Sequence, residues 1–228
     1  MTKLILLRHG ESVWNKLNLF TGWVDISLSS KGIEEALVAG DLLANIAFDA
    51  IYVSALIRAQ LTAMLVMSRT KTGKVACMMH DEDPQYGSMS KIHDTHTLAT
   101  IIPVYAHAEL NERMYGNLQG LNKQATLEKY GETQFKLWRR SFRGVPPEGE
   151  SLEMTAARTI PFFKKNILPR LEKGETILIS AHGNSLRAIV MFLENLSEEA
   201  VVSLEIPTGK ALCYHLESGF WKKQTLLG

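Results

Sequence analysis

Short unbroken runs of apolar residues alternate along the chain with stretches whose apolar positions recur at helical spacing. The runs span residues 4–7, 50–53 and 177–179, and each has the length of one strand. Such runs are typical of strands that are buried on both faces of a parallel sheet. We therefore expect three strands in the interior of one sheet.

Four stretches at helical spacing predict helices between and after these runs. Their expected starts follow Ser29 or Ser30, Ser54, Ser151 and Asn184. Serine and asparagine are favoured at such positions because their side chains accept the unpaired backbone N–H groups of the first turn. The second helix should run towards Met67, and Pro161 should kink or divide the third.

This alternation predicts an α/β fold with an open, mostly parallel sheet, helices on both faces and an active site at the carboxyl ends of the strands. Residues 71–108 mix glycine, proline, aspartate and four histidines with little periodicity, so we expect an excursion over the sheet. Residues 144–149 predict a second loop. Neither segment resembles a linker, and residues 1–228 are predicted to form a single domain.

Composition narrows the classes of function. A hydrophobic fraction of 46% suits a sizeable core, and a formal net charge of +1 argues against a general nucleic-acid binder. Residues 4–7 are too short for a signal-peptide core or a membrane span, so we expect a cytoplasmic protein without a membrane segment. Cys77 and Cys213 have apolar neighbours and predict buried thiols, with a disulfide between them as the alternative.

Two histidines follow two of the predicted strands in the same way. His9 and Gly10 come after the first run, and His182 and Gly183 come after the third. Because ligands bind beyond the carboxyl ends of strands in open α/β sheets, both histidines could face one crevice. Glycine lets backbone N–H groups approach an anion, and the helix after Asn184 would direct its positive end there. The alternative is two ordinary, partly buried histidines at strand ends.

Arginines in other segments add candidates for binding an anion. Arg58 lies near the start of the second predicted helix, and Arg113, Arg139 and Arg140 lie in polar segments. Guanidinium groups stay charged and bind phosphate or carboxylate with two parallel hydrogen bonds. Taken singly, each arginine is typical of a solvated surface group.

At this point the residues match a known family over most of the chain. The chain resembles the cofactor-dependent (2,3-bisphosphoglycerate-dependent) phosphoglycerate mutases of the histidine phosphatase superfamily. The matching stretches are LRHGESVWN (7–15), FTGWVD (20–25), LNER (110–113), YG (115–116), LQGLNK (118–123), WRRS (138–141), GES (149–151), AHGNSLR (181–187) and PTG (207–209). Arg-His-Gly alone would indicate only the superfamily, and the later stretches resemble mutases.

The resemblance implies a reaction and a catalytic set. His9 would be the phosphorylated nucleophile, and 2,3-bisphosphoglycerate would prime it for the interconversion of 3-phosphoglycerate and 2-phosphoglycerate. Arg8, Arg58 and His182 would surround the transferring phosphoryl group and offset its charge without a metal. Glu112 would be the general acid and base, a role that a raised pKa would suit. Without the resemblance, a salt bridge to its neighbour would be the simpler reading of Glu112.

The resemblance also implies the groups that hold the substrate. Hydroxyl, amide and backbone donors would come from Gly10, Ser12, Asn15, Thr21, Gly22, Tyr115, Gly183 and Asn184. The carboxylate and the second phosphate would be neutralised by Arg113, Lys123, Arg139 and Arg140. Arg8, Arg58 and Glu112 belong to this binding set as well. Several cations in one pocket are expected because each phosphoryl group carries close to two charges.

The chain departs from the family pattern in three places. Residues 67–110 are longer than in many members, residues 141–149 are shorter, and Met114 stands where many members have histidine. These departures concern subunit contacts and the shape of an active-site lid more than the chemistry. The sequence is compatible with a homo-oligomer.

Three other readings compete with a mutase. A histidine-type acid phosphatase for small phosphorylated metabolites would share the phosphoenzyme, with water as the acceptor. A non-catalytic module that binds phosphorylated ligands would be expected to lack the nucleophile or the acid, and both are present. A metal site would have to come from His80, Asp81, His93, Asp94, His96 and His107, whose spacing fixes no geometry.

The C-terminal segment carries a hypothesis of its own. Residues 220–223 contain an aromatic pair followed by two lysines. We expect this segment to close over the pocket and to add positive charge there, as lids do. A frayed terminus is the alternative.

Overall fold

A computed structural model describes residues 3–80, 84–217 and 219–224. Its strands are β1 (Lys3–Arg8), β2 (Ala50–Ser54), β3 (Val75–Met79), β4 (Ile101–His107), β5 (Thr176–Ala181), β6 (Ala211–Glu217) and β7 (Phe220–Gln224). They form one sheet in the order β3-β4-β2-β5-β1-β6-β7. The strands from β3 to β1 are parallel, and β6 and β7 are antiparallel. The predicted open, mostly parallel sheet is confirmed, and the three expected runs are β1, β2 and β5.

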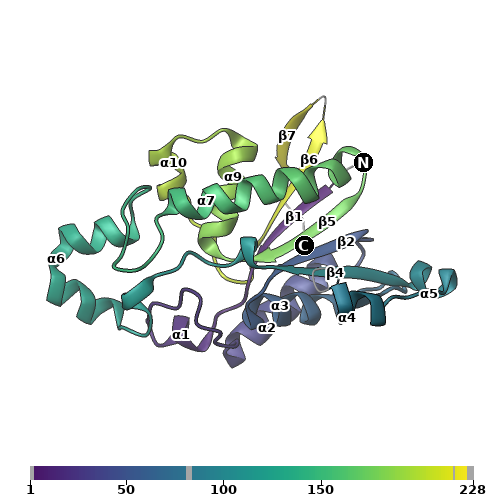
Figure 1. Ribbon diagram of the computed structural model, residues 1–228, viewed down its shortest axis with the longest axis horizontal. Helices are drawn as coiled ribbons and strands as arrows, with labels where there is room; N and C mark the ends of the chain where they lie inside the picture. The colour runs from purple at the N-terminus through teal and green to yellow at the C-terminus, as the bar shows by residue number, and fades with distance from the viewer. Residues whose placement is uncertain (1–2, 81–83, 218, 225–228) are drawn as a thin grey trace.

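Helices cover both faces of the sheet (Figure 1). On one face lie α2 (Ser30–Leu43) and α3 (Ile57–Met67), and on the other lie α7 (Leu152–Phe162), α8 (Leu168–Glu172) and α9 (Gly183–Glu194). The remaining helices are α1 (Val13–Lys16), α4 (Pro84–Met89), α5 (Thr95–Thr100), α6 (Lys123–Arg139) and α10 (Glu198–Ser203), with 3₁₀ turns η1 (Ala108–Leu110) and η2 (Gly116–Leu118). At the carboxyl ends of the parallel strands, α1 and α6 extend to one end of the molecule (Figure 1).

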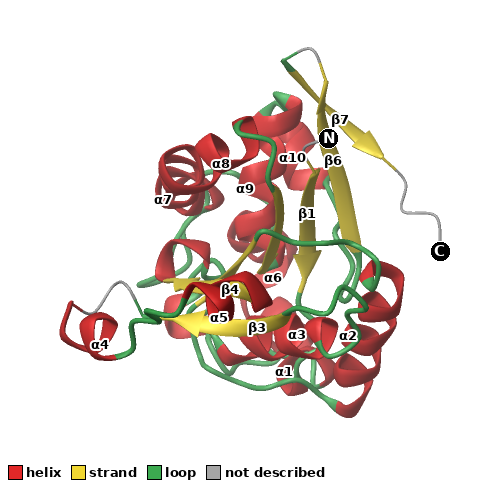
Figure 2. Ribbon diagram, turned by 90° about the vertical axis from the view of Figure 1, so that its right-hand side faces the viewer, coloured by secondary structure: helices red, strands yellow, loops and turns green. Residues whose placement is uncertain are grey.

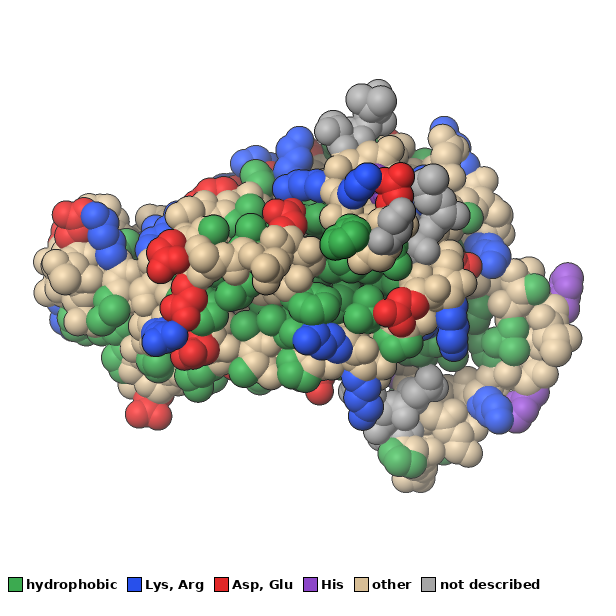
Figure 3. Space-filling model, turned by 90° about the horizontal axis from the view of Figure 1, so that it is seen from above, with side chains coloured by type: hydrophobic (Ala, Val, Ile, Leu, Met, Phe, Trp, Pro, Cys, Tyr) green, Lys and Arg blue, Asp and Glu red, His purple; other side chains and the backbone are tan. Residues whose placement is uncertain are grey.

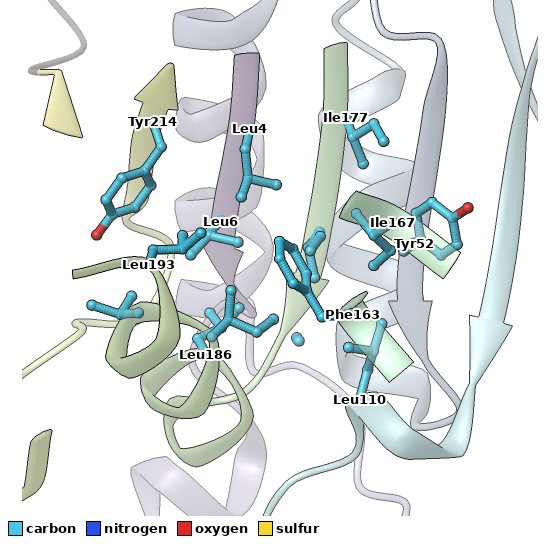
Figure 4. Close-up of a cluster of buried hydrophobic side chains, with 14 of the residues drawn as sticks. Leu4, Leu6, Tyr52, Leu110, Phe163, Ile167, Ile177, Leu186, Leu193 and Tyr214 are labelled. Atoms are coloured by element: carbon cyan, nitrogen blue, oxygen red, sulfur yellow. The ribbon is translucent and has the colours of Figure 1, made fainter. Parts of the chain in front are cut away.

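Successive residues of β1 face two different cores. Leu4 and Leu6 pack with Leu186 in the cluster under α7, α8 and α9 (Figure 4), whereas Ile5 and Leu7 pack in the cluster under α2 and α3. Each fully buried leucine contributes about 2 kcal/mol to stability. Burial on both faces is the reason why residues 4–7 of the strand include no polar position.

The four predicted helices form, with small shifts in their starts. Ser29 caps α2 and accepts the Gly32 N–H, and α3 ends at Met67 as expected. His182 is itself the N-cap of α9, so this helix begins before Asn184. Pro161 lies inside α7, and a π-helix (η3, Phe163–Ile167) follows directly. Proline removes one backbone donor from the helix. The chain responds with a stretch of π-helix after Pro161, and the helix is not divided there.

The expectation for residues 71–108 is wrong in part, because this segment supplies β3 and β4 to the sheet. Residues 75–79 of β3 are all apolar, but the run is short and lies among glycine, lysine, histidine and aspartate residues, and Pro103 interrupts the apolar run of β4. The edge strand β3 leaves Val75 63% exposed, and β4 contains Pro103, which pairs with Cys77. The polar and irregular residues around the short run of β3, and the proline within β4, are the reason why this segment predicts an excursion. The short helices of this segment lie beside these strands, with α5 at one end of the molecule (Figure 1) and α4 to one side of β3 and β4 (Figure 2).

The C-terminal residues 220–223 do not close over a pocket. They belong to β7, which pairs with β6 at the outer edge of the sheet. Trp221 packs against the core, while Phe220 is exposed, so an amphipathic edge strand forms instead of a lid. Lys222 pairs with Glu217.

Both cysteines are free thiols, of which Cys213 is buried as predicted, whereas Cys77 is only partly buried. Cys77 lies on β3 and Cys213 on β6, five strand positions apart in the sheet. At about 4.8 Å per strand, the two backbones are roughly 24 Å apart. A disulfide requires Cα atoms within about 7 Å of each other, which rules out the alternative.

No helix among the described residues is both long enough and apolar enough to cross a bilayer.

Candidate active site

His9 stands at the carboxyl end of β1, and its neighbour sets the orientation of its ring. His9 Nδ1 donates to the Gly10 carbonyl at 2.7 Å. Since a carbonyl can only accept, Nδ1 carries the ring hydrogen. Burial, with the charges of Arg58 and Arg8, holds the pKa of His9 well below its ordinary value. Near pH 7 His9 is therefore a neutral imidazole with a nucleophilic Nε2.

Backbone packing fixes the turn that follows His9. The Gly10 N–H donates to Thr62 Oγ1 at 3.1 Å. A Cβ on Gly10 would lie 2.2 Å from the Gly32 carbonyl oxygen, closer than any side chain allows. Gly10 therefore supports His9 from behind.

His182 lies beside His9, as the matching strand ends predict. Strands β1 and β5 pair in parallel with Arg8 opposite Ala181, which brings the two ring centroids to 4.9 Å. His182 Nε2 lies 2.7 Å from Ser54 Oγ at the end of β2. Burial, then the charges of Arg58 and His9, lowers the pKa of His182 well below its ordinary value. Two neutral imidazoles therefore meet where three strands end.

Two guanidinium groups border this pair. Arg58, from the first turn of α3, is almost fully buried and donates to the Gly22 carbonyl at 2.7 Å and the Val24 carbonyl at 3.0 Å. Burial lowers its pKa to about 10, so it stays charged at neutral pH. Arg8 donates to the Ile206 carbonyl at 2.6 Å. Backbone carbonyls thus hold both cations in place.

Glu112 contributes a buried carboxylate. Its Oε1 accepts the N–H groups of Arg113 at 2.8 Å and Asn184 at 3.1 Å, and the Asn184 side-chain amide at 2.8 Å. Burial alone raises the pKa of Glu112, but the Arg113 N–H, Arg8, the Asn184 amide and Arg58 together bring it below its ordinary value. The expected raised pKa is therefore wrong for the ligand-free protein, and Glu112 is ionised.

These groups line a pocket of about 130 Å³ at the carboxyl ends of the strands. Its walls carry six cationic side chains and two carboxylates. The lining residues are Arg8, His9, Asn15, Leu19, Phe20, Thr21, Gly22, Arg58, Glu112, Tyr115, Lys123, Arg139, Arg140, Gly183, Asn184, Arg187, Glu205 and Ile206. Thirteen of the seventeen residues singled out in the sequence are among them.

The other four lie behind the wall. His182 touches His9, and Gly10 supports the turn. Ser12 caps α1, accepting the Asn15 N–H, and the Asn15 side chain bonds back to the Ser12 N–H. Arg113 is buried and donates to the Tyr115 hydroxyl at 3.0 Å, so it orients Tyr115 and lies outside the pocket wall.

Sequence reasoning missed five wall residues, of which two are charged. Arg187 lies one helical turn after Asn184 on α9, and its Nη1 is 3.3 Å from the Asn184 side-chain oxygen. Helical spacing could have identified it. Glu205 pairs with Arg140 at 2.7 Å. No local pattern marks Glu205, because tertiary packing alone brings its loop to the pocket.

Several buried polar atoms around His9 have no hydrogen-bond partner among the described residues. They are Arg8 Nε, Thr21 Oγ1, Arg58 Nε and His182 Nδ1. Unpaired buried polar atoms are rare in folded proteins, and a bound ligand is one common explanation. Guanidinium donors and a positive wall fit an anionic ligand with several oxygens.

The described residues contain no group of three or more histidine, cysteine, aspartate or glutamate side chains that could hold a metal ion. His93 and His96 are exposed, and imidazoles gather at the end of the molecule where α5 lies (Figure 3). His80 stacks on Tyr86 at 4.2 Å between ring centroids. Asp81 lies outside the described residues.

A family model for the histidine phosphatase superfamily (branch 1) matches residues 4–82 and 88–226. The chain belongs to the histidine phosphatase superfamily. Membership agrees with the sheet, with the histidine at the end of β1 and with its partner at the end of β5.

Curated superfamily proteins are similar over almost the whole chain. A Chlamydia muridarum protein named 2,3-bisphosphoglycerate-dependent phosphoglycerate mutase is 52% identical over 226 residues, which are 99% of each chain. A Chlamydia felis protein of the same name is 54% identical over 214 residues, covering 94% of this chain and 93% of that one.

Solved structures from the superfamily share the fold at lower identity. The mycobacterial glucosyl-3-phosphoglycerate phosphatase is 23% identical with a TM-score of 0.75, covering 98% of both chains. The α-ribazole phosphatase from Shigella flexneri is 24% identical with a TM-score of 0.74, covering 97% of this chain and 94% of that one. At this identity the likeness concerns the fold alone.

Proposed function

We propose that the chain interconverts 3-phosphoglycerate and 2-phosphoglycerate in glycolysis and gluconeogenesis, as a cytoplasmic enzyme. A phosphohistidine on His9, primed by 2,3-bisphosphoglycerate, carries the phosphoryl group. The main support is the pocket, where six cationic side chains and two carboxylates surround a neutral histidine. A bisphosphoglycerate brings a carboxylate and close to two charges per phosphoryl group, which this excess of cations can offset. Curated relatives more than 50% identical carry the mutase name.

In the first step, His9 Nε2 attacks a phosphorus atom of the bisphosphate. The P–O bond to the glycerate breaks, its electron pair stays on the glycerate oxygen, and Glu112 supplies a proton to that oxygen. Arg8, Arg58 and His182 offset the charge on the transferring group. In the second step, the free 2-hydroxyl of 3-phosphoglycerate attacks the phosphohistidine, the P–N bond to His9 breaks, and Glu112 takes the hydroxyl proton. The 2,3-bisphosphoglycerate so formed turns in the pocket and returns its 3-phosphoryl group to His9 as in the first step, which releases 2-phosphoglycerate.

Glu112 is ionised in the ligand-free protein but must carry a proton to act as an acid, and the charge of the bound ligand accounts for this change. In the ligand-free protein, Arg8 and Arg58 help to keep the pKa of Glu112 low. Phosphoryl oxygens next to these arginines offset their charge, so the pKa of Glu112 rises when the ligand binds. A proton released as the phosphate ionises can then pass to Glu112. The raised pKa that the reaction requires thus belongs to the complex.

The rest of the wall holds the glycerate and the second phosphate. Cationic contacts come from Lys123, Arg139 and Arg140, and polar contacts from Asn15, Thr21, Gly22, Tyr115, Gly183 and Asn184. Gly10, Ser12 and Arg113 support these groups from behind. The reaction uses no metal, and a homo-oligomer stays a prediction.

One experiment tests the whole proposal. The protein is incubated with 2,3-bisphosphoglycerate labelled in its phosphoryl groups, the labelled residue is identified, and 3-phosphoglycerate is then added. We expect label on His9, formation of 2-phosphoglycerate, and neither in a His9→Gln control. Label on another residue contradicts the nucleophile. Label on His9 that is released only as inorganic phosphate assigns a phosphatase instead.

A further inference from the structure

One side chain outside the pocket binds the backbone of the segment that carries Glu112. Arg158, on α7, donates to three backbone carbonyls of residues 109–112. The distances are 2.7 Å to Glu109, 3.0 Å to Asn111 and 2.9 Å to Glu112. Glu109 lies in η1, and residues 111–115 join η1 to η2 with no helix or strand of their own. The path of this segment therefore depends on the guanidinium.

Glu150 connects Arg158 to the backbone on the other side of Glu112. Arg158 donates from Nε to Glu150 Oε1 at 3.0 Å and from Nη2 to Oε2 at 2.9 Å. Glu150 Oε2 also accepts the Met114 N–H at 3.0 Å. Burial raises the pKa of Glu150, but the Arg158 bond and the Met114 N–H outweigh it and leave the pKa lowered. Glu150 is therefore ionised, and the side chains of both partners are less than a fifth exposed.

Trp23 links Arg158 and the Glu112 backbone to the end of the pocket where the phosphoryl group is transferred. The Trp23 indole N–H donates to the Glu112 carbonyl at 2.5 Å, and the Arg158 guanidinium lies 5.5 Å from the centre of the Trp23 ring. Trp23 follows Gly22, whose carbonyl anchors Arg58. The Glu112 carbonyl thus receives two donors.

A partly buried ion pair is weak support for stability, because removing both charges from water offsets much of their attraction. Its geometry, however, is specific, since a planar fork can bind several carbonyls at once. A misplacement of 1 Å costs about 100-fold in the rate of a catalysed step. Position is therefore what this arrangement controls best.

We propose that Arg158 and Glu150 are positioning residues that place the Glu112 carboxyl against the glycerate oxygen during phosphoryl transfer. This inference rests on the proposed function, in which Glu112 exchanges a proton with that oxygen. Arg158 reaches the substrate only through the backbone of residues 109–112.

The test compares two phosphoryl donors with different leaving groups. The phosphoglycerate that leaves 2,3-bisphosphoglycerate is an alkoxide and requires the acid, whereas the phenolate of p-nitrophenyl phosphate leaves without one. In Arg158→Lys, a point charge replaces the fork. We expect phosphohistidine formation from the bisphosphate to slow by about 30-fold, and from p-nitrophenyl phosphate by less than about 3-fold. Glu150→Gln, which keeps Arg158, should show the same selectivity with a smaller loss.

Arg170→Lys is the matched control, because Arg170 also joins a partly buried glutamate, Glu175, at 2.6 Å. It should leave both rates unchanged. Equal slowing with both donors in Arg158→Lys, or no slowing, overturns the positioning role. Wild-type protein that is not labelled by either donor contradicts the proposed function instead. Crystal structures of wild type and both variants then decide the inference, and an unmoved Glu112 carboxyl overturns it.

Discussion

The two ends of the pocket differ in burial and in how their charges are held. At the inner end, His9, His182 and Arg58 are at most 2% exposed, and Arg58 is bound to backbone carbonyls. At the outer end, the side chain of Arg140 is 40% exposed and that of Glu205 is 65% exposed. The two side chains form an ion pair at 2.7 Å with each other.

Because of this difference, the two ends of the pocket have different roles in the reaction. Fixed, water-excluded charges stabilise a transition state without reorganising, whereas exposed charges are screened and mainly attract the ligand. We therefore expect changes at the inner end to act on kcat and to be insensitive to salt. Changes at the outer end should act on KM and weaken as salt is added.

The largest effect is expected at Arg58. Arg58→Lys removes the fork that binds two carbonyls beside His9, and the rate of phosphohistidine formation should fall by about 10⁴-fold. Rapid-quench kinetics with 2,3-bisphosphoglycerate measures this rate. Arg69→Lys, an exposed change just beyond α3, is the control and should have no effect. A raised KM with unchanged kcat in Arg58→Lys would break the comparison.

A smaller loss is expected at Glu112. Glu112→Gln keeps an oxygen for the Arg113 and Asn184 donors, so the Tm should hold, but kcat for mutase turnover should fall by about 10³-fold. Transfer from p-nitrophenyl phosphate should be spared. An equal loss of rate with the phosphoglycerate substrates and with p-nitrophenyl phosphate would show that Glu112 shapes the pocket without acting as an acid.

Lys123 should produce a dependence on pH at the outer end. Burial, then Arg139 and Arg8, lowers its pKa to about 8, so its charge is present below that value and is lost above it. KM for 3-phosphoglycerate should rise by about 10-fold as the pH passes from about 7 to 9. Lys123→Arg should flatten this rise. Steady-state profiles of both proteins measure it, and an unchanged rise in the variant assigns it to another group.

The smallest effect is expected at Glu205. Glu205→Gln removes a negative charge from the wall and frees Arg140, so KM for phosphoglycerates should fall by about 2- to 3-fold at low salt. High salt should abolish the difference. A change in kcat would show that Glu205 acts like the residues at the inner end of the pocket, which contradicts the proposed difference between the two ends.

The sequence predicted most of the inner end correctly. An unbroken apolar run followed by His-Gly marks a buried strand and the point where it ends, and parallel strands bring such ends together. His9 and His182 therefore could be paired from the sequence alone. The strand β3 was missed although residues 75–79 are all apolar, because irregular polar residues surround this short run, and β4 was missed because Pro103 interrupts its apolar pattern.

Local sequence determined which segments become strands and helices, and it identified the histidines and most of the cations around them. Tertiary structure alone decided three things. It placed the charges of Arg8 and Arg58 and the Asn184 amide where they lower the pKa of Glu112 against the effect of burial, held Arg113 beside the Arg139 carbonyl, and brought Glu205 and Arg158 to their positions. Periodicity reports which face of an element is buried, whereas these contacts join residues that only the folded chain brings within reach.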